Sequence, residues 1–234
     1  MPLRKILSRS PLVARVAPFV IFVLLTAAQG EFGAASAYWF YLAKTLVGLW
    51  LILEIRPLVA EMRWAFSPLG LAVGVGIFAL WVGINSEWTT QNSLWIKLGI
   101  SSPPKNPATA WNPNEQFGSG SALAWFFVAV RILGSTFIVP PLEEIFYRSF
   151  LFRYIANQNF LSVPLNQFLP LPFFATAFVF GFSHNEWLAG ILCGMAYQWL
   201  VLRKNRLGDA MTAHAITNFL LGVWVVWRGA WNFW

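Results

Sequence analysis

Nine residues in the middle of the chain combine charge with an apolar setting: Pro140-Pro141-Leu142-Glu143-Glu144-Ile145-Phe146-Tyr147-Arg148. The sequence around them is typical of lipid-facing helices. Two adjacent carboxylates and an arginine there need a physical reason, because a charged side chain in hydrocarbon costs about 2.5 to 3.5 kcal/mol. Such residues tend to pair, line a cavity and serve a function. The stretch therefore predicts a membrane protein with buried chemistry.

Composition supports the same class. The chain is 58% hydrophobic, 18% aromatic and only 11% charged, whereas soluble domains carry about 25% charged residues. Apolar windows of roughly membrane-spanning length fall at 16–29, 38–55, 69–84, 122–139, 142–156, 171–184, 187–202 and 210–227. We predict an all-α polytopic membrane protein, one domain over residues 1–234, in which about eight transmembrane helices enclose a polar intramembrane cavity.

The first window has two interpretations. Basic residues precede it, and Ala27-Ala28-Gln29-Gly30 resembles a weak signal-peptide cleavage site. Because another apolar span begins within ten residues, we expect an uncleaved first helix. The positive-inside rule then places the amino terminus and residues 56–63 inside, with the Glu31 loop and residues 85–121 outside. Eight full crossings would leave residues 203–206 outside, whereas a short or re-entrant 142–156 segment would place them inside.

Other features of the sequence are less informative about function. The net charge of +7 follows helix ends rather than forming a groove, so nucleic-acid binding is not expected. Cys193 is the single cysteine, which excludes an intrachain disulfide. Trp88, Trp95 and Trp111 in the outer segment indicate an interfacial cap or aromatic belts. Small-residue pairs at 70–74 and 190–194 predict close helix packing. Lys44 and Arg131 lie within apolar windows, where each could line an aqueous path or reach the interface, and both stay unassigned.

The two carboxylates of the acidic motif are expected on different sides of a helix. Neighbouring residues differ by about 100° around a helix, whereas residues four apart share a face. Glu144 is therefore expected to pair with Arg148, which leaves Glu143 as the base. If the two prolines before it begin a helix, the positive end of the helix dipole favours ionised Glu143.

The only two histidines of the chain lie in its apolar second half. His184 occurs in Phe180-Gly181-Phe182-Ser183-His184, and His214 lies one helical turn before Asn218. A carboxylate and an imidazole can deprotonate water, while another imidazole and an amide can donate to an oxyanion. We expect Glu143 and His184 to activate water, and His214 and Asn218 to stabilise the oxyanion of a scissile carbonyl.

Three alternatives remain at this point. Glu143, His184 and His214 could bind zinc with one open position, although the usual H-E-x-x-H spacing is absent. The cluster could instead bind a peptide without hydrolysing it, as a membrane adaptor. It could also be a hydrogen-bonded network that only joins helices. A transporter is less favoured, since repeats and paired broken helices are not evident.

The three ordered motifs, Glu143-Glu144-xxx-Arg148, Phe180-xxx-His184 and His214-xxx-Asn218, resemble those of the CPBP family. That family includes CAAX prenyl endopeptidases and bacteriocin-processing relatives, and the resemblance covers about residues 122–228. It implies a glutamate-dependent intramembrane endopeptidase that uses no cofactor. Its implied catalytic residues are Glu143, His184, His214 and Asn218, with Glu144 and Arg148 supporting them.

Residues 180–200 and the ending 228–234 are similar to a bacterial subgroup of this family, the CAAX prenyl protease-related proteins. That subgroup is associated with exosortase systems, which handle PEP-CTERM sorting signals. The similarity implies a multi-pass protein of the bacterial inner membrane, with a membrane-associated peptide or protein as substrate and exosortase-system proteins as partners. It does not imply a prenylated substrate.

Overall fold

Helices and turns make up the computed structural model, which describes residues 2–84, 89–101 and 110–234, and no strand occurs in these ranges. Among the residues that the structure describes, three helical segments are long and apolar enough to cross a membrane: Ser36–Ile55, Ala122–Ala156 and Gly208–Arg228. Shorter apolar helices are Pro11–Ala27, Pro68–Gly83 and Pro170–Phe182. The prediction of an all-α polytopic membrane protein is confirmed.

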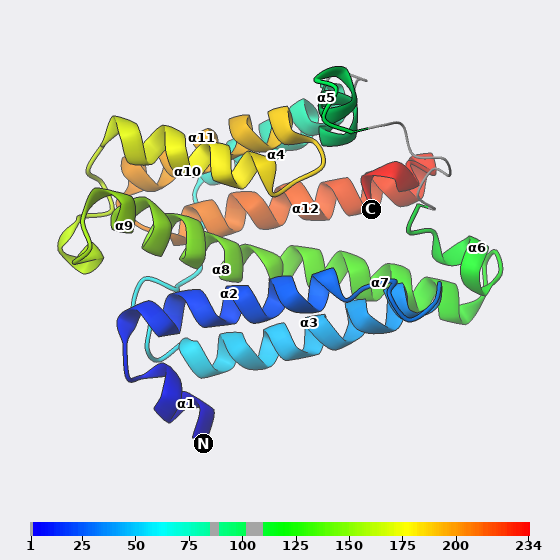
Figure 1. Ribbon diagram of the computed structural model, residues 1–234, viewed down its shortest axis with the longest axis horizontal. Coiled ribbons are helices and arrows are strands. Elements are labelled where there is room, and N and C mark those ends of the chain that lie inside the picture. Colours follow the sequence, from blue (N-terminus) through cyan, green and yellow to red (C-terminus); the bar gives the residue numbers. More distant parts are fainter. Residues whose placement is uncertain (1, 85–88, 102–109) are drawn as a thin grey trace. The chain divides into compact units, whose positions relative to one another are not determined.

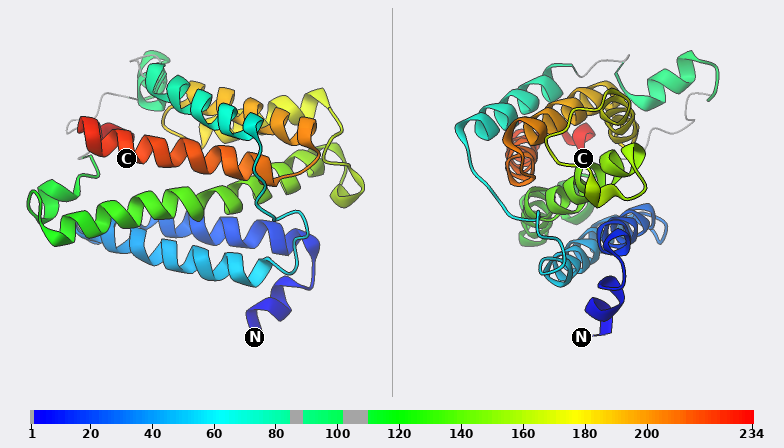
Figure 2. Two further views of the ribbon diagram at one scale, coloured as in Figure 1. Left: turned by 180° about the vertical axis from the view of Figure 1, so that it is seen from behind. Right: turned by 90° about the vertical axis from the view of Figure 1, so that its left-hand side faces the viewer.

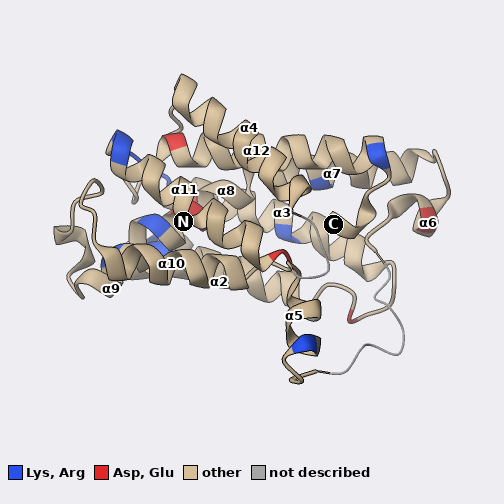
Figure 3. Cartoon of the chain, turned by 90° about the horizontal axis from the view of Figure 1, so that it is seen from above, with Lys and Arg blue, Asp and Glu red and all other residues tan. Residues whose placement is uncertain are grey.

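The chain forms two compact units, each assembled from separate stretches of sequence. The first unit contains Met1–Met62, Thr109–Phe146 and Asn218–Trp234. The second contains Arg63–Ala108 and Tyr147–Thr217. Charged residues are sparse along the helices of both (Figure 3).

The first unit combines helices from the amino-terminal, central and carboxyl-terminal parts of the chain. Its elements are α1 (Pro2–Leu7), α2 (Pro11–Ala27), α3 (Ser36–Ile55), α6 (Pro113–Phe117), α7 (Ala122–Phe137), α8 (Val139–Glu144), η3 (Trp231–Phe233) and the second half of α12 (Gly208–Arg228). Helices α2 and α3 lie side by side, and α7 packs against α3 (Figure 1, Figure 2). Ion pairs between Arg4 and Glu54 and between Arg15 and Glu61 connect α1 and α2 to α3 and the turn that follows it.

The two prolines of the acidic motif occupy the first turn of α8, directly after the end of α7 at Ile138. Proline is tolerated there because first-turn N–H groups make no intrahelical bond. Residues 122–156 run as one helical segment of 35 residues, so the windows at 122–139 and 142–156 belong to a single segment. The expected place of the two prolines is confirmed, because they lie in the first turn of α8. The effect of the helix dipole on Glu143 stays a prediction.

If residues 122–156 cross the membrane once, the positive-inside rule predicts the second basic loop, Arg203, Lys204 and Arg206, on the cytoplasmic side. Arg206 pairs with Asp209 at the start of α12, and this hydrogen bond raises the pKa of Arg206 above its ordinary value. Asp209 also accepts from Ser67, whose side chain caps α4.

The second unit is built around two closely packed helices. Its elements are α4 (Pro68–Gly83), α5 (Gln91–Lys97), the π-helix η1 (Ile145–Leu151), α9 (Phe152–Ala156), η2 (Phe160–Ser162), α10 (Pro170–Phe182), α11 (Trp187–Lys204) and the first half of α12. Helices α10 and α11 pack together along their lengths (Figure 1). The predicted packing role of the small residues is confirmed, since a Cβ on Gly190 would lie 2.8 Å from the Cα of Gly181. A Cβ on Gly74 would lie 2.7 Å from the carbonyl oxygen of Ala213.

Replacing Gly190 by alanine tests this packing. We expect Gly190→Ala to destabilise the protein by about 1 to 3 kcal/mol, because the new methyl group meets backbone atoms that cannot rotate away. Gly76→Ala is the matched control, since nothing lies within 4 Å of a Cβ there and alanine favours helix. Thermal unfolding of the purified protein should show a lower midpoint for the first variant only. Equal midpoints would contradict the packing.

Candidate active site

The ring of Phe180 contacts the predicted site residues of the second unit. Its centroid is 4.4 Å from the guanidinium carbon of Arg148 and 4.6 Å from the centroid of the His184 ring. The His214 ring meets it nearly edge-on at 6.1 Å. One residue from each of the three motifs therefore gathers around a single aromatic ring. Phe180 is itself fully buried, so the cluster is part of the core of this unit.

His184 is held in one orientation by the last turn of α10. Its Nδ1 lies 2.7 Å from the carbonyl oxygen of Phe180, four residues earlier. Since a carbonyl oxygen only accepts hydrogen bonds, Nδ1 carries the hydrogen and the lone pair of the neutral ring is on Nε2. The half-buried His184 thereby presents a basic nitrogen on the side of the ring opposite its anchor.

The turn that carries His184 is fixed from two further directions. The hydroxyl of Tyr147, in the π-helix, donates to Ser183 Oγ at 3.1 Å, and Ser183 donates to the Phe180 carbonyl at 2.7 Å. From the outer segment, Gln91 Nε2 donates to the carbonyl oxygens of Phe182 and His184 at 2.6 and 2.7 Å. Gln91 could not be predicted, because an amide in a predicted loop has no sequence pattern that connects it to a distant turn.

His214 lies deeper than His184 and is 3% exposed. The ring of Tyr197 stacks on it at 5.2 Å with an interplanar angle of 30°. The Tyr197 hydroxyl donates to Thr217 at 2.7 Å, and Thr217 in turn donates to the carbonyl of Gly74. Tyr197 was missed by the sequence analysis. Its only signal is a hydroxyl inside an apolar window, which packing alone could explain.

Arg148 and Glu144 are both fully buried. Arg148 belongs to η1, and one of its terminal nitrogens lies 3.4 Å from the carbonyl oxygen of Gly194 on α11. π-Helical turns are rare and frequently occur at functional sites, which agrees with the place of this one in the acidic motif. The predicted pairing of Glu144 with Arg148 stays a prediction.

The first unit contains the other predicted site residues, Glu143, Glu144 and Asn218. Glu143 is half-buried near the end of α8. The side-chain amide of Asn218 donates to the carbonyl oxygen of Ser135 on α7 at 2.8 Å. An amide carries two N–H hydrogens, so this bond fixes the side chain while the second hydrogen stays suited to an oxyanion. The structure thus brings Arg148, His184 and His214 together, and the roles that combine them with the first unit remain predictions.

Two further findings concern ligand sites. Within residues 2–84, 89–101 and 110–234, no group of three or more His, Cys, Asp or Glu side chains could hold a metal ion.

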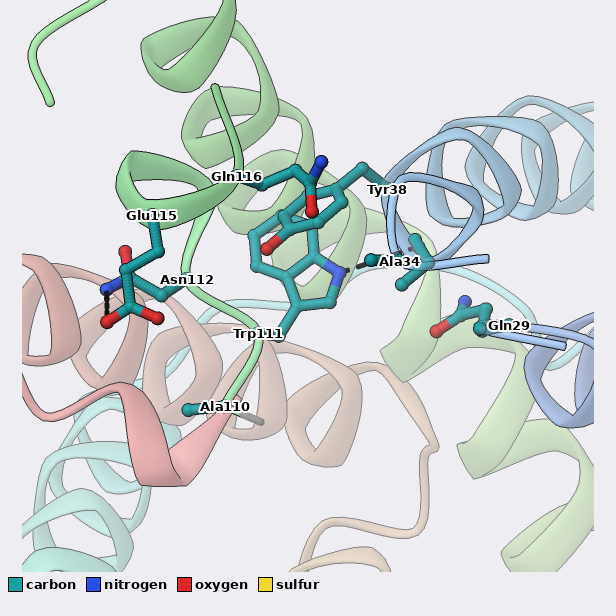
Figure 4. A pocket seen from close by; sticks show the side chains of 10 residues that line it. Gln29, Ala34, Tyr38, Ala110, Trp111, Asn112, Glu115 and Gln116 are labelled. Atoms are coloured by element: carbon teal, nitrogen blue, oxygen red, sulfur yellow. Dashed lines mark hydrogen bonds between the residues drawn. The ribbon is translucent and has the colours of Figure 1, made fainter. Parts of the chain in front are cut away.

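A cavity of about 450 Å³ in the first unit is lined by residues that include Tyr38, Trp111 and Glu115 (Figure 4). Trp111 packs there with Tyr38, Tyr41 and Phe127, and the choice between an interfacial cap and aromatic belts stays open. Trp88 lies outside the described residues.

The helices and their buried ionisable groups define the class, which is an α-helical polytopic membrane protein. Residues 122–220 match the family described as Rce1-like, type II CAAX prenyl endopeptidase Rce1-like. This match supports the CPBP family of CAAX proteases for the segment that holds all three motifs. Neither a curated protein nor a solved structure matches the chain.

Two substitutions at His184 separate its anchoring from its basic nitrogen. Asparagine can donate from a position close to Nδ1 but has no equivalent of Nε2. We expect His184→Asn to keep the thermal midpoint near that of the wild type, and His184→Ala to lose about 1 kcal/mol with the hydrogen bond. Thermal unfolding of both purified variants measures this. Equal losses in the two variants would contradict the Nδ1 anchor.

Proposed function

We propose that the protein is an intramembrane endopeptidase that hydrolyses a peptide bond in a membrane-associated peptide or protein. The observation that supports this most strongly is the anchored His184, whose lone pair is on Nε2, in a cluster made from all three family motifs. A general base needs a nitrogen with a lone pair to accept a proton. In the neutral ring, the Nδ1 anchor leaves Nε2 for that role.

The proposed reaction needs no covalent intermediate with the protein. Glu143 and His184 take a proton from water as its oxygen adds to the scissile carbonyl carbon. The carbonyl oxygen becomes an oxyanion that accepts hydrogen bonds from His214 and Asn218. The proton then passes to the departing amine as the C–N bond breaks. Base catalysis contributes roughly 10² to 10⁴ in rate, and one oxyanion donor about 10² to 10³.

Glu144 and Arg148 would support these groups rather than react. Arg148 is fully buried against Phe180, the same ring that contacts both histidines. A fixed charge in that position would hold the rings at constant geometry during turnover.

The proposed setting is the inner membrane of a bacterium. The substrate would be a membrane-associated peptide or protein, and exosortase-system proteins would be the partners. This part of the proposal rests on the similarity of residues 180–200 and 228–234 to the CAAX prenyl protease-related subgroup.

Glu143→Gln tests the function directly, because an amide cannot act as a base. Membrane proteomes of a deletion strain carrying the wild type or the variant at equal abundance would be compared for changed peptide termini. We expect termini that are present with the wild type to be lost with the variant, with activity reduced by about 10² or more. Glu31→Gln, at an exposed loop position, is the matched control and should behave as the wild type. Identical termini with full rescue of the phenotype by Glu143→Gln would instead indicate a non-catalytic adaptor.

Metal dependence is tested separately. The proposed reaction uses only protein groups and water, so a strong chelator should leave both cleavage and the thermal midpoint unchanged. Cleavage would be followed with the substrate whose terminus the proteome comparison identifies. Loss of cleavage after chelation, with recovery on addition of zinc, would establish the zinc-dependent alternative at Glu143, His184 and His214.

A further inference from the structure

The cavity of the first unit has no part in the proposed reaction. Its volume of about 450 Å³ falls within the roughly 300 to 1,000 Å³ of small-molecule sites. Its walls come from three segments of the chain, which contribute Gln29 and Gly30, then Ala34, Ala37 and Tyr38, and finally Ala110, Trp111, Asn112, Glu115 and Gln116. Most of the polar groups in these walls are amides, a hydroxyl and a carboxylate. The cavity is therefore suited in size and chemistry to a small polar group.

The cavity lies where three apolar helices have their ends. One wall follows the end of α2, a second includes the start of α3, and the third leads through α6 to the start of α7. Tyrosine and tryptophan, which are typical of the headgroup level of a membrane, line it together. The polar group that a membrane presents at this level is the headgroup of a lipid.

Glu115 supplies an anionic group in one wall. The side-chain amide of Asn112 donates to Glu115 Oε1 at 2.8 Å, and Asn112 is itself buried and caps α6 through its Oδ1. Among the described residues, no cation forms an ion pair with Glu115. A carboxylate can accept several hydrogen bonds through its two oxygens. Glu115 is thus held in place and keeps acceptor capacity for an ammonium group.

Arg131 supplies the opposite charge beside the same cavity. Its guanidinium carbon lies 4.6 Å from the ring centroid of Trp111, which lines the cavity, and 4.8 and 5.3 Å from the ring centroids of Tyr41 and Trp234. In the part of the chain that the structure describes, no carboxylate forms an ion pair with it. Arg131 is only half-buried. The protein therefore holds a cation here without supplying its counter-charge, which favours an anionic group nearby.

Gln29 adds a hydrogen-bond donor on the other side of the cavity. Figure 4 shows Glu115 and Asn112 on one side of the rings of Tyr38 and Trp111, and Gln29 on the other. The side-chain nitrogen of Gln29 is buried and has no hydrogen-bond partner in the described chain. A buried polar atom without a partner is uncommon in folded proteins, and an oxygen of a ligand would satisfy it. The two sides of the cavity thus suit an ammonium group and an acceptor oxygen respectively.

We propose that this cavity binds the zwitterionic phosphoethanolamine headgroup of a membrane lipid. The ammonium group of the lipid binds Glu115, while its phosphate oxygens accept from Gln29 and are attracted by the charge of Arg131. An anionic headgroup without an amine would leave Glu115 unpaired, and a simple alkylammonium would leave Arg131 without an anion. The binding involves no reaction, so it does not depend on the proposed hydrolysis.

Native mass spectrometry of the purified full-length protein in detergent measures lipid binding directly. Phosphatidylethanolamine would be compared, at matched chain length, with phosphatidylglycerol, which has the phosphate but no amine, and with an alkylamine, which has the ammonium group but no phosphate. We expect phosphatidylethanolamine to bind about tenfold more tightly than either, because each comparison removes hydrogen bonds to a charged group. Equal binding of the three, or tighter binding of phosphatidylglycerol, would overturn the proposal.

Glu115→Gln separates this cavity from the rest of the surface. The side chain is exposed, so the thermal midpoint should stay unchanged while the preference for phosphatidylethanolamine over phosphatidylglycerol falls about tenfold. Glu31→Gln is the matched control, because Glu31 is an exposed carboxylate that does not line the cavity. The control should keep the wild-type preference. A preference that survives Glu115→Gln, or that falls equally in both variants, would contradict the assigned ammonium site.

Ala34→Trp is the second variant, because it fills the cavity without changing any charge. Ala34 is exposed, so the fold should tolerate the larger side chain. We expect its binding of phosphatidylethanolamine to weaken to the level of phosphatidylglycerol in the wild type. Wild-type binding in Ala34→Trp would place the lipid elsewhere on the protein and overturn the proposal.

Discussion

The complete burial of Arg148 against Phe180 is the constraint on which the rest of the candidate site depends. A guanidinium cannot lose its charge in a protein, so a helix that buries one in the membrane must surround it with compensating groups. The aromatic face of Phe180 and the carbonyl of Gly194 provide part of this. Because the same ring contacts His184 and His214, the arginine, both histidines and the close α10–α11 packing are parts of one arrangement. A change in any of them alters the surroundings of the others.

The local backbone explains why these residue types occur where they do. Two prolines can follow α7 without ending the helical segment, because they fall where N–H groups are dispensable. The π-helical turn then carries Tyr147 and Arg148. On α10, the carbonyl of Phe180 holds Nδ1 of His184. Short-range backbone geometry thus sets the orientation of a side chain whose chemistry depends on which nitrogen has the lone pair.

The sequence predicted the class of fold well, because apolar windows and sparse charge are strong signals of membrane helices. It divided residues 122–156 into two windows, since the acidic motif interrupts hydropathy without interrupting the helix. The structure brings Arg148, His184 and His214 together around Phe180, whereas the expected pairs of Glu143 with His184 and of His214 with Asn218 stay predictions. The supporting residues Gln91 and Tyr197 were not found, because hydrogen bonds and ring stacking between distant segments leave no periodic pattern.

The central claim is that this chain itself hydrolyses a peptide bond with water activated at Glu143. The most direct measurement uses the purified protein in proteoliposomes with solubilised membrane proteins of the host in ¹⁸O-labelled water. New carboxyl termini that carry one ¹⁸O atom would be identified by mass spectrometry. The account predicts labelled termini with the wild type and none with Glu143→Gln. Absence of labelled termini with the wild type, or equal labelling with both proteins, would contradict it.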